Sequence, residues 1–160
     1  MAIDINNPYF RTKVMTASQE ELRLMLIEGA LRFMREGREA MTRRDWEGVY
    51  NGFSQAKAIL IELINALRPE VAPELCRNLS SLYTYMYTRL TEGSMQKDIA
   101  AVDEVIELME YDRETWLLLM DKLAKDKSSG ATPAAGAVPA PAAAPAAAPA
   151  KPRPALSIQG

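Results

Sequence analysis

Acidic side chains occur in close pairs at three places, and two neighbouring carboxylates are residue types that can share general acid–base catalysis. The pairs are Glu20 with Glu21, Glu104 with Glu107, and Glu110 with Asp112. A working acid–base pair needs a cleft that shifts the pKa of one carboxyl away from that of the other. These carboxylates stand beside Lys, Arg or predicted turns, so we interpret them as solvated helix faces.

The chain has no histidine and a single cysteine, Cys76. Without histidine it lacks the commonest general base, the commonest imidazole metal ligand, and the Glu-x-x-His pairs that hold two metals in four-helix carboxylate proteins. A lone cysteine without a base partner is typical of a buried, inert thiol and is compatible with a reducing compartment. The sequence therefore predicts no catalytic residue, no metal site and no cofactor, and it argues against an enzyme.

Charge is nearly balanced over the 160 residues, with 19 basic and 21 acidic side chains. All 21 acidic residues lie before residue 128. The same part of the chain contains 17 basic residues, so its net charge is −4. Such a balance disfavours nucleic acid, whose binding depends on Lys and Arg neutralising phosphates. No apolar run is long enough for a membrane span, and the amino terminus shows no secretory signal. We therefore expect a soluble cytoplasmic protein without membrane insertion.

Two long amphipathic segments occupy the first part of the chain. The first begins at Ser18, which forms a capping box with Glu21, and extends to about Thr42. Asp45 is positioned to cap the second, which covers residues 46–67 and repeats its apolar residues at the period of a helix. Both segments are predicted helices.

Two further helices are predicted after the turn that Pro69 and Pro73 bracket. The third carries apolar residues from 75 to 90 and should end at Gly93, a residue suited to a left-handed C-cap. Ser94 is then a candidate cap for the fourth, whose apolar residues continue to 123. Four amphipathic helices joined by short turns predict an all-α, antiparallel four-helix bundle.

The bundle domain is predicted to cover residues 18–127, with a different kind of segment on each side. Residues 1–17 are expected to be extended, because Pro8 disfavours helix before it, and to serve as a lid. Residues 131–155 contain 13 Ala and 7 Pro, which predicts a disordered, polyproline-like tail over 128–160. The alternative function of that tail is a tether or a docking segment ending in Leu156-Ser157-Ile158.

The first predicted helix carries two apolar stripes on nearly opposite sides. One stripe contains Leu22, Met25, Leu26, Gly29 and Phe33, and the other contains Leu24, Ile27, Leu31 and Met34. A helix that is apolar nearly all round is normally buried, but a member of a four-helix bundle needs one arc toward the axis. We therefore assign the Leu22 stripe to the core. The Leu24 stripe then has three possible roles: it is buried within the bundle, it forms a self-association surface, or it lines a groove that holds an amphipathic peptide.

Several motifs, in one register, resemble the flagellin export chaperone family known as FliS. They begin with Tyr9-x4-Val14-x-Thr16-Ala17-Ser18 and "EELRLMLIEGALRF". They continue with "QAKAILIEL" at 55–63, "LYTYMYTRL" at 82–90 and "KDIAAVDEVIELMEYDRETW" at 97–116. The resemblance covers roughly residues 7–124. It implies a cytoplasmic chaperone for type III secretion that binds the disordered carboxyl-terminal segment of flagellin. The chaperone would prevent premature polymerisation and deliver flagellin to the cytoplasmic domain of the flagellar export gate.

Guided by this resemblance, we predict a partner-binding surface for the client. Tyr9 serves in the lid or contacts the client, and Tyr85 and Tyr87 edge the groove. The floor of the groove is the stripe of Leu24, Ile27, Leu31 and Met34. The alternative is a helical adaptor or regulator that binds another amphipathic helix in an apolar groove. Whether the chain forms a homodimer is left open.

Overall fold

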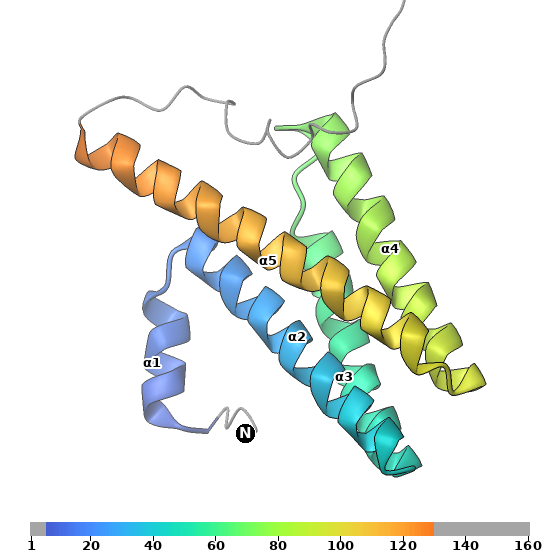
Figure 1. Cartoon of the computed structure of the whole chain (residues 1–160). Coiled ribbons are helices and arrows are strands. Elements are labelled where there is room, and N and C mark those ends of the chain that lie inside the picture. Colours follow the sequence, from blue (N-terminus) through green and yellow to red (C-terminus); the bar gives the residue numbers. More distant parts are fainter. Residues whose placement is uncertain (1–5, 130–160) are drawn as a thin grey trace, which may run out of the picture.

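The computed structural model describes residues 6–129, and within that range the chain is helical and contains no strand. The helices are α1 (Pro8–Thr16), α2 (Gln19–Thr42), α3 (Trp46–Asn65), α4 (Pro73–Gln96) and α5 (Ile99–Ser128) (Figure 1). α2 packs against α3 and α5, and α4 packs against the same two helices. Short connections make each of these four helices antiparallel to the next (Figure 1). The predicted helical bundle is confirmed, whereas the predicted tail beyond residue 129 lies outside the described residues.

Both predicted caps of the first two bundle helices are present. The Ser18 backbone N–H donates to Glu21 Oε1 at 2.8 Å, and the Glu21 N–H donates to Ser18 Oγ at 3.1 Å. Asp45 Oδ1 accepts from the Gly48 N–H at 3.0 Å. These bonds satisfy amide groups that have no partner within their own helix. The cap residues therefore determine where α2 and α3 begin.

The segment before α2 differs from the prediction. Pro8 begins α1 rather than preventing it, because a proline restricts the residue before it and fits the first helical position itself. Asn7 is extended, with φ −66° and ψ 119°, and its Oδ1 accepts from the Tyr9 N–H at 2.8 Å. The expected extended conformation over residues 1–17 is therefore wrong for residues 8–16. α1 buries none of its residues and stands beside the bundle (Figure 1).

The boundary between α4 and α5 also differs from the prediction. Gly93 lies inside α4, which continues to Gln96 and ends at Lys97 with a left-handed φ of 56°. A Cβ on Gly93 would lie 3.0 Å from Val102 Cγ2, so this glycine lets α5 approach closely. Asp98, rather than Ser94, caps α5 by accepting from the Ala101 N–H at 3.3 Å. The predicted helix end at Gly93 and cap at Ser94 are therefore wrong.

The tightest packing in the bundle joins α2 to α3. A three-residue connection, residues 43–45, links them and contains Arg44 with a left-handed φ of 58°. A Cβ on Gly52 would lie 2.8 Å from the Gly37 backbone nitrogen and 2.9 Å from the Phe33 carbonyl oxygen. The two backbones therefore approach to a distance that only glycine permits.

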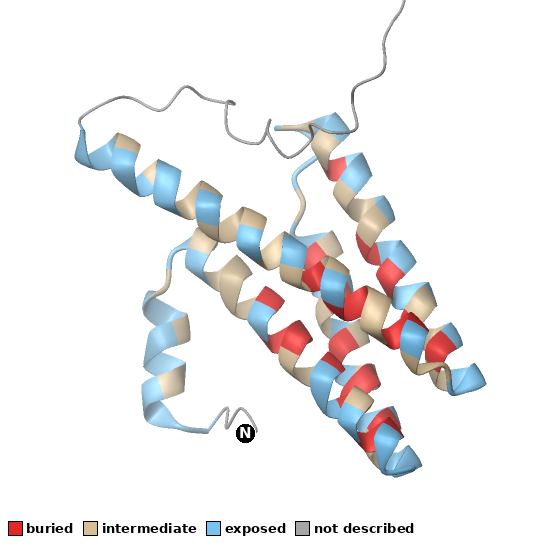
Figure 2. Cartoon of the chain, viewed as in Figure 1, coloured by how far each residue is buried: buried red, intermediate tan, exposed pale blue. Residues whose placement is uncertain are grey.

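The two ends of the bundle differ in how completely they are buried. We call the start of α2 (residues 19–26), the start of α4 (residues 73–82) and the second half of α5 (residues 110–128) the open end. The closed end lies at the α2–α3 and α4–α5 connections. The buried residues of α5 all lie between Ala101 and Met109, and Cys76 alone is buried within the three open-end segments. Figure 2 shows buried residues toward the closed end and partly or fully exposed ones along the second half of α5.

No helix within residues 6–129 combines the length and the hydropathy that crossing a bilayer requires.

Candidate functional site

The structure corrects the roles predicted for the two stripes of α2. Ile27 and Met34 are completely buried and Leu31 is 2% exposed, so these side chains belong to the core and not to an exposed groove floor. Leu24 is half-buried. In the other stripe Gly29 is buried, while the large side chains are half-buried: Leu22, Met25, Leu26 and Phe33.

The error comes from the number of neighbours assumed for α2. This helix contacts both α3 and α5, so apolar side chains are needed on two sides and not along a single arc. The glycines at 29 and 37 face α3, where bulky side chains would prevent close packing. The Leu22 stripe therefore contributes less to the buried core than the stripe through Ile27 and Leu31. Of the predicted floor, Leu24 alone remains partly accessible.

The three predicted tyrosines are exposed but lie in separate places. Tyr9 is on α1 and is 77% exposed. Tyr85 faces α5, because its hydroxyl donates to Glu104 Oε2 at 2.6 Å. Tyr87 faces α3, because the Lys57 ammonium lies 5.2 Å from the centre of its ring. The structure does not bring these side chains together into one groove.

A short hydrogen-bond chain crosses from α4 to α5 at Tyr85. Arg89 Nε donates to the second carboxylate oxygen of Glu104 at 2.9 Å. The bonds from Tyr85 and Arg89 lower the pKa of the Glu104 carboxyl, and the same Glu104 contact raises the pKa of the Tyr85 phenol. Both groups keep their ordinary charge at neutral pH. They hold α4 beside α5 and do not form an acid–base pair.

Three further carboxylates of the predicted pairs are also engaged. Glu21 caps α2, Glu110 pairs with Arg35, and Asp112 bonds to Tyr83. Within residues 6–129, no group of three or more His, Cys, Asp or Glu side chains is placed to hold a metal ion.

A polar cluster that the sequence analysis missed connects α2, α4 and α5. The completely buried Tyr83 donates from its hydroxyl to Asp112 Oδ2 at 2.7 Å and accepts from Arg23 Nη2 at 2.6 Å. The Arg23 guanidinium also lies 5.2 Å from the centre of the Trp116 ring, and Trp116 Nε1 donates to the Glu20 carbonyl oxygen at 3.0 Å. The helical pattern places Tyr83 on a core stripe, but Arg23 and Asp112 carry no signal in the sequence that pairs them with it.

Burial sets the protonation of this cluster. Removal from water raises the pKa of the Tyr83 phenol, and the nearby Asp112 charge raises it further. Removal from water also raises the pKa of the Asp112 carboxyl, while the Tyr83 bond and the Arg23 charge oppose that rise. The phenol is therefore a permanent donor at neutral pH. The cluster closes the core at the border with the open end.

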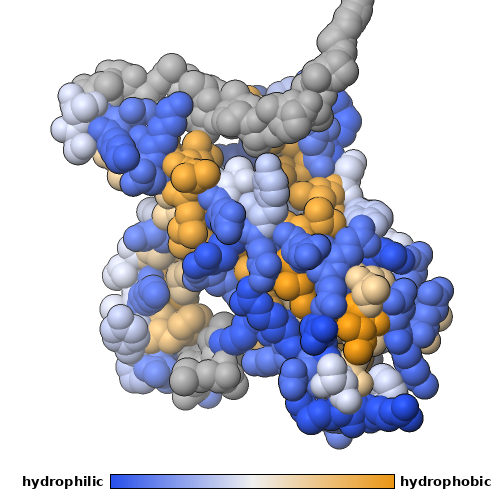
Figure 3. All heavy atoms as spheres, in the orientation of Figure 1, coloured by the Kyte–Doolittle hydropathy of each residue, from blue (hydrophilic) through white to orange (hydrophobic). Residues whose placement is uncertain are grey.

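Beyond the cluster, the open end carries large apolar side chains that the bundle leaves partly accessible. On α4 they are Leu75, Leu79 and Leu82, and on α5 they are Trp116, Leu117, Leu119, Met120 and Leu123. Leu118 is 73% exposed. Figure 3 shows hydrophobic atoms over the second half of α5 and again in the region between α5 and α4. We call this set of side chains the open-end surface.

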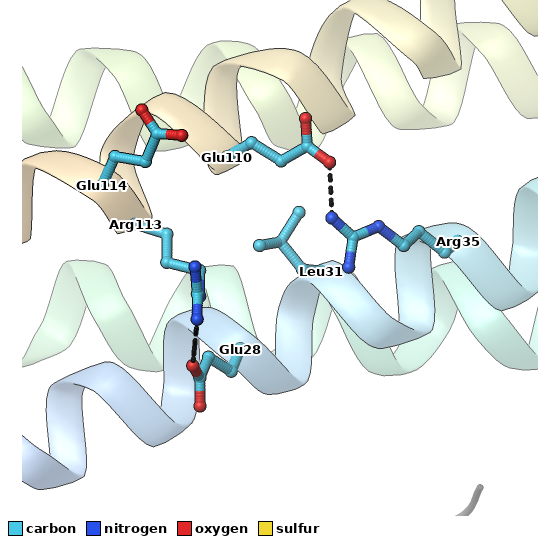
Figure 4. Close-up of a pocket in the computed structure, with 6 residues that line it drawn as sticks. All are labelled: Glu28, Leu31, Arg35, Glu110, Arg113 and Glu114. Atoms are coloured by element: carbon cyan, nitrogen blue, oxygen red, sulfur yellow. Dashed lines mark hydrogen bonds and ion pairs between the residues drawn. The ribbon is translucent and has the colours of Figure 1, made fainter. Parts of the chain in front are cut away.

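The groove between α2 and α5 is different in character. Its volume is about 590 Å³, and five of its six lining residues are charged: Glu28, Arg35, Glu110, Arg113 and Glu114, with Leu31 as the sixth. Arg113 donates to Glu28 Oε2 at 3.0 and 2.9 Å, and Arg35 pairs with Glu110 (Figure 4). Figure 4 shows Leu31 between these two ion pairs. Paired charges thus occupy the groove, which suits an apolar ligand less well than the open-end surface does.

Known proteins resemble this chain over the whole bundle. Residues 1–123 match the family described as Flagellar protein FliS. The flagellar secretion chaperone FliS of Escherichia coli (strain K12) is 37% identical over 119 residues, which cover 71% of this chain and 85% of that protein. The flagellar secretion chaperone FliS of Bacillus subtilis (strain 168) is 31% identical over 126 residues, which cover 77% of this chain and 93% of the relative. The family match ends before the Ala/Pro-rich segment.

Proposed function

Because this chain belongs to the FliS family, we propose that it is a cytoplasmic flagellar secretion chaperone whose client is the disordered carboxyl-terminal segment of flagellin. Binding would keep flagellin from polymerising prematurely and would deliver it to the cytoplasmic domain of the flagellar type III export gate. The named relatives support the role in secretion. The identity of the client and the delivery step are our proposal.

One observation carries the proposal: the bundle covers the open-end surface only partly, and three of its side chains, Leu79, Leu82 and Trp116, pack against the buried core. An amphipathic helix binds by laying its apolar face against such a surface. Full burial of one Leu or Met contributes roughly 1.5–3 kcal/mol, so completing the burial of several half-covered side chains contributes several kcal/mol. That gain must exceed the cost of ordering the client, about 2–5 kcal/mol. The number of half-buried side chains at the open end is sufficient.

α1 is a second element of the proposed client site. It buries none of its residues, although its Phe10 and Val14 are partly covered. Ala17 and Ser18 connect α1 to the start of α2, which is part of the open end. We propose that α1, with the exposed Tyr9, contacts the client or yields its place to it. The bonds that fix α1 locally, such as the Asn7 cap, remain intact in either position.

Binding of a flagellin carboxyl-terminal peptide to variants of the open-end surface tests the proposal. Leu75 and Leu119 are half-buried and are not packed against the buried core, so replacing both with Asp should leave the fold intact. Because a bound helix would desolvate the new carboxylates, which is costly without a partner, we expect affinity to fall at least tenfold in isothermal titration. Thermal unfolding should stay within a few degrees of the unsubstituted chain.

The control places a carboxylate on an exposed aromatic side chain at the other end. Tyr50 is 72% exposed near the start of α3, and Tyr50→Asp should bind the peptide with unchanged affinity. Full-strength binding by the double Leu75 and Leu119 variant would contradict the site. Equal binding of unrelated amphipathic peptides would instead favour a general helical adaptor.

A further inference from the structure

The carboxyl-terminal segment begins at the open end. α5 is the last helix, and its residues 110–128 form one side of the open-end surface. Residue 130 therefore continues from the apolar surface that the bundle leaves partly uncovered.

The length of the segment sets how far it can reach. α5 spans about 45 Å at 1.5 Å per residue. The 26 residues from 130 to 155 reach up to about 80 Å when fully extended at about 3.1 Å per residue. Chain length thus permits the last residues of the protein to return to any part of the open end.

The composition of this segment changes at its end. Ala and Pro dominate residues 131–155, and large apolar side chains return at Leu156 and Ile158. Two cations, Lys151 and Arg153, come directly before them and are the only charged side chains after residue 127. A linker of small residues thus ends in one short motif with two positive and two large apolar side chains.

The open end offers complementary groups to that motif. Glu70 and Glu74 lie in the α3–α4 connection and the first turn of α4, next to Leu75, and both are exposed. Neither takes part in an ion pair with another residue between 6 and 129. Exposed Arg68 and Arg77 lie in the same stretch. The two carboxylates are the groups there that match the two cations of the motif, and the half-buried Leu75 matches its Leu and Ile.

We infer that residues 151–158 dock on the open-end surface of their own chain, with Leu156 and Ile158 against its apolar side chains and Lys151 and Arg153 near Glu70 and Glu74. This inference rests on the proposed function in one respect: the docked segment would occupy part of the surface proposed for flagellin. The segment then acts as an internal competitor that the client displaces.

The expected size of the competition follows from the linker. A connection of this length and composition holds the motif at an effective concentration of about a millimolar. Two apolar side chains and two exposed ion pairs make a weak contact, with an intrinsic dissociation constant also near the millimolar range. The surface is then free in roughly a fifth to a half of the molecules, and the apparent affinity for the client falls to that fraction of its intrinsic value. Removing the competitor should raise client affinity about two- to fivefold.

Energy transfer within the full chain tests the docking without any client. Trp116 lies at the open end and serves as the donor when Trp46 is replaced with Phe, because these are the only two tryptophans. A dansyl acceptor on Gln159→Cys, in a Cys76→Ala background, marks the end of the chain. We expect clear transfer in this protein and a drop in transfer when Leu156 and Ile158 are both replaced with Asp. The matched control, Ala142→Asp with Ala144→Asp, adds the same charge to the linker and should leave transfer unchanged.

Equal transfer in the Leu156 and Ile158 double variant and in its parent overturns the inference. This measurement contains no flagellin, so its failure is distinct from a failure of flagellin peptide to bind. Titration of that peptide then tests the competition: the Leu156→Asp, Ile158→Asp chain should bind it two- to fivefold more tightly. A drop in transfer with no change in peptide affinity would show that the motif docks away from the client surface, and would overturn the regulatory part.

Discussion

The closed and open ends of this bundle are built from the same four helices, yet they bury their apolar residues to very different degrees. Within α5, residues 101–109 contain five buried side chains and residues 110–128 contain none, although the second half carries a tryptophan, four leucines and a methionine. Glycines at 37, 52 and 93 bring the helices together toward the closed end. Toward the open end, the Arg23–Tyr83–Asp112 cluster joins the helices with polar bonds instead.

The difference shows that apolar content alone does not determine where a core forms. Close packing requires that facing helices approach each other, and small residues at the contact make this possible. Where helices are held together by longer side chains, apolar groups remain half-covered. Such groups add less to folding stability and remain available to a partner. The closed end is therefore expected to carry most of the stability, and the open end most of the binding.

The largest effect is expected at the stripe of α2 that continues from the open end into the core. Replacing Ile27 and Leu31 together with Asp should unfold the domain, because each would bury an unpaired charge and total stability is only about 5–15 kcal/mol. Far-UV circular dichroism should show loss of most helical signal. The control is Leu118→Asp, at a site of α5 that is 73% exposed, and this variant should retain the helical signal. A folded double variant would mean that this stripe is not part of the core.

An intermediate effect is expected at the closed end from a single methyl group. Gly52→Ala should lower the free energy of unfolding by about 1–3 kcal/mol, since the added Cβ would meet the backbone of α2 at Gly37 and Phe33. Urea denaturation measures the loss. Gly29→Ala is the matched control: its Cβ would lie 3.3 Å from Ile59 Cδ1, a side-chain end that can move, so stability should hold or rise slightly. Equal losses in both variants would contradict the special role of the Gly37–Gly52 contact.

An effect of similar size is expected at the border between the ends, and unlike the glycine effect it should depend on pH. Tyr83→Phe removes the hydroxyl that donates to Asp112, which should cost about 1–3 kcal/mol at pH 7 because a buried carboxylate loses its donor. Burial already raises the pKa of Asp112 in the folded protein above its ordinary value of 3.8. The hydrogen bond from the Tyr83 hydroxyl lowers the pKa of Asp112. Removing that hydroxyl should therefore raise the pKa of Asp112 further.

The sign of the pH effect follows from this shift. Between the unfolded and folded pKa values, the folded state of either protein binds more protons, so stability falls as pH rises through this window. The fall continues to a higher pH in the variant, whose folded pKa is higher. The variant should therefore lose more stability than its parent at pH 7 and less near pH 4. Thermal unfolding at the two pH values measures the difference, and a loss independent of pH would show that Asp112 does not depend on the Tyr83 bond.

Local patterns predicted the helices well, because each depends on residues close in sequence. The Ser18–Glu21 box and the Asp45 cap specify helix starts from three or four residues. The wrong prediction at Pro8 also has a local reason. A proline disfavours helix at the residue before it, here Asn7, but it does not disfavour helix in the residues that follow. Gly93 is needed for the close approach of α5, but in the sequence a glycine at this position also fits the end of a helix.

The candidate site was much harder to predict, because its geometry depends on contacts between distant segments. The period of α2 reveals two apolar stripes, but which one becomes core depends on the positions of α3 and α5. Arg23 and Asp112 look like ordinary surface charges until the fold places both beside Tyr83, 60 and 29 residues away in sequence. The open-end surface is likewise invisible in sequence, since its leucines repeat at the same period as those of the core.

The three-residue connection between α2 and α3 has a consequence for the order of events during folding. Closing so short a loop costs little chain entropy, and proteins rich in local contacts fold fast. The α2–α3 hairpin, already joined by the glycine contact, can assemble before α5 has left the ribosome. The second half of α5 would then arrive last on a preformed hairpin. A newly made chain would thus acquire its stable half first and its binding half at the end of synthesis.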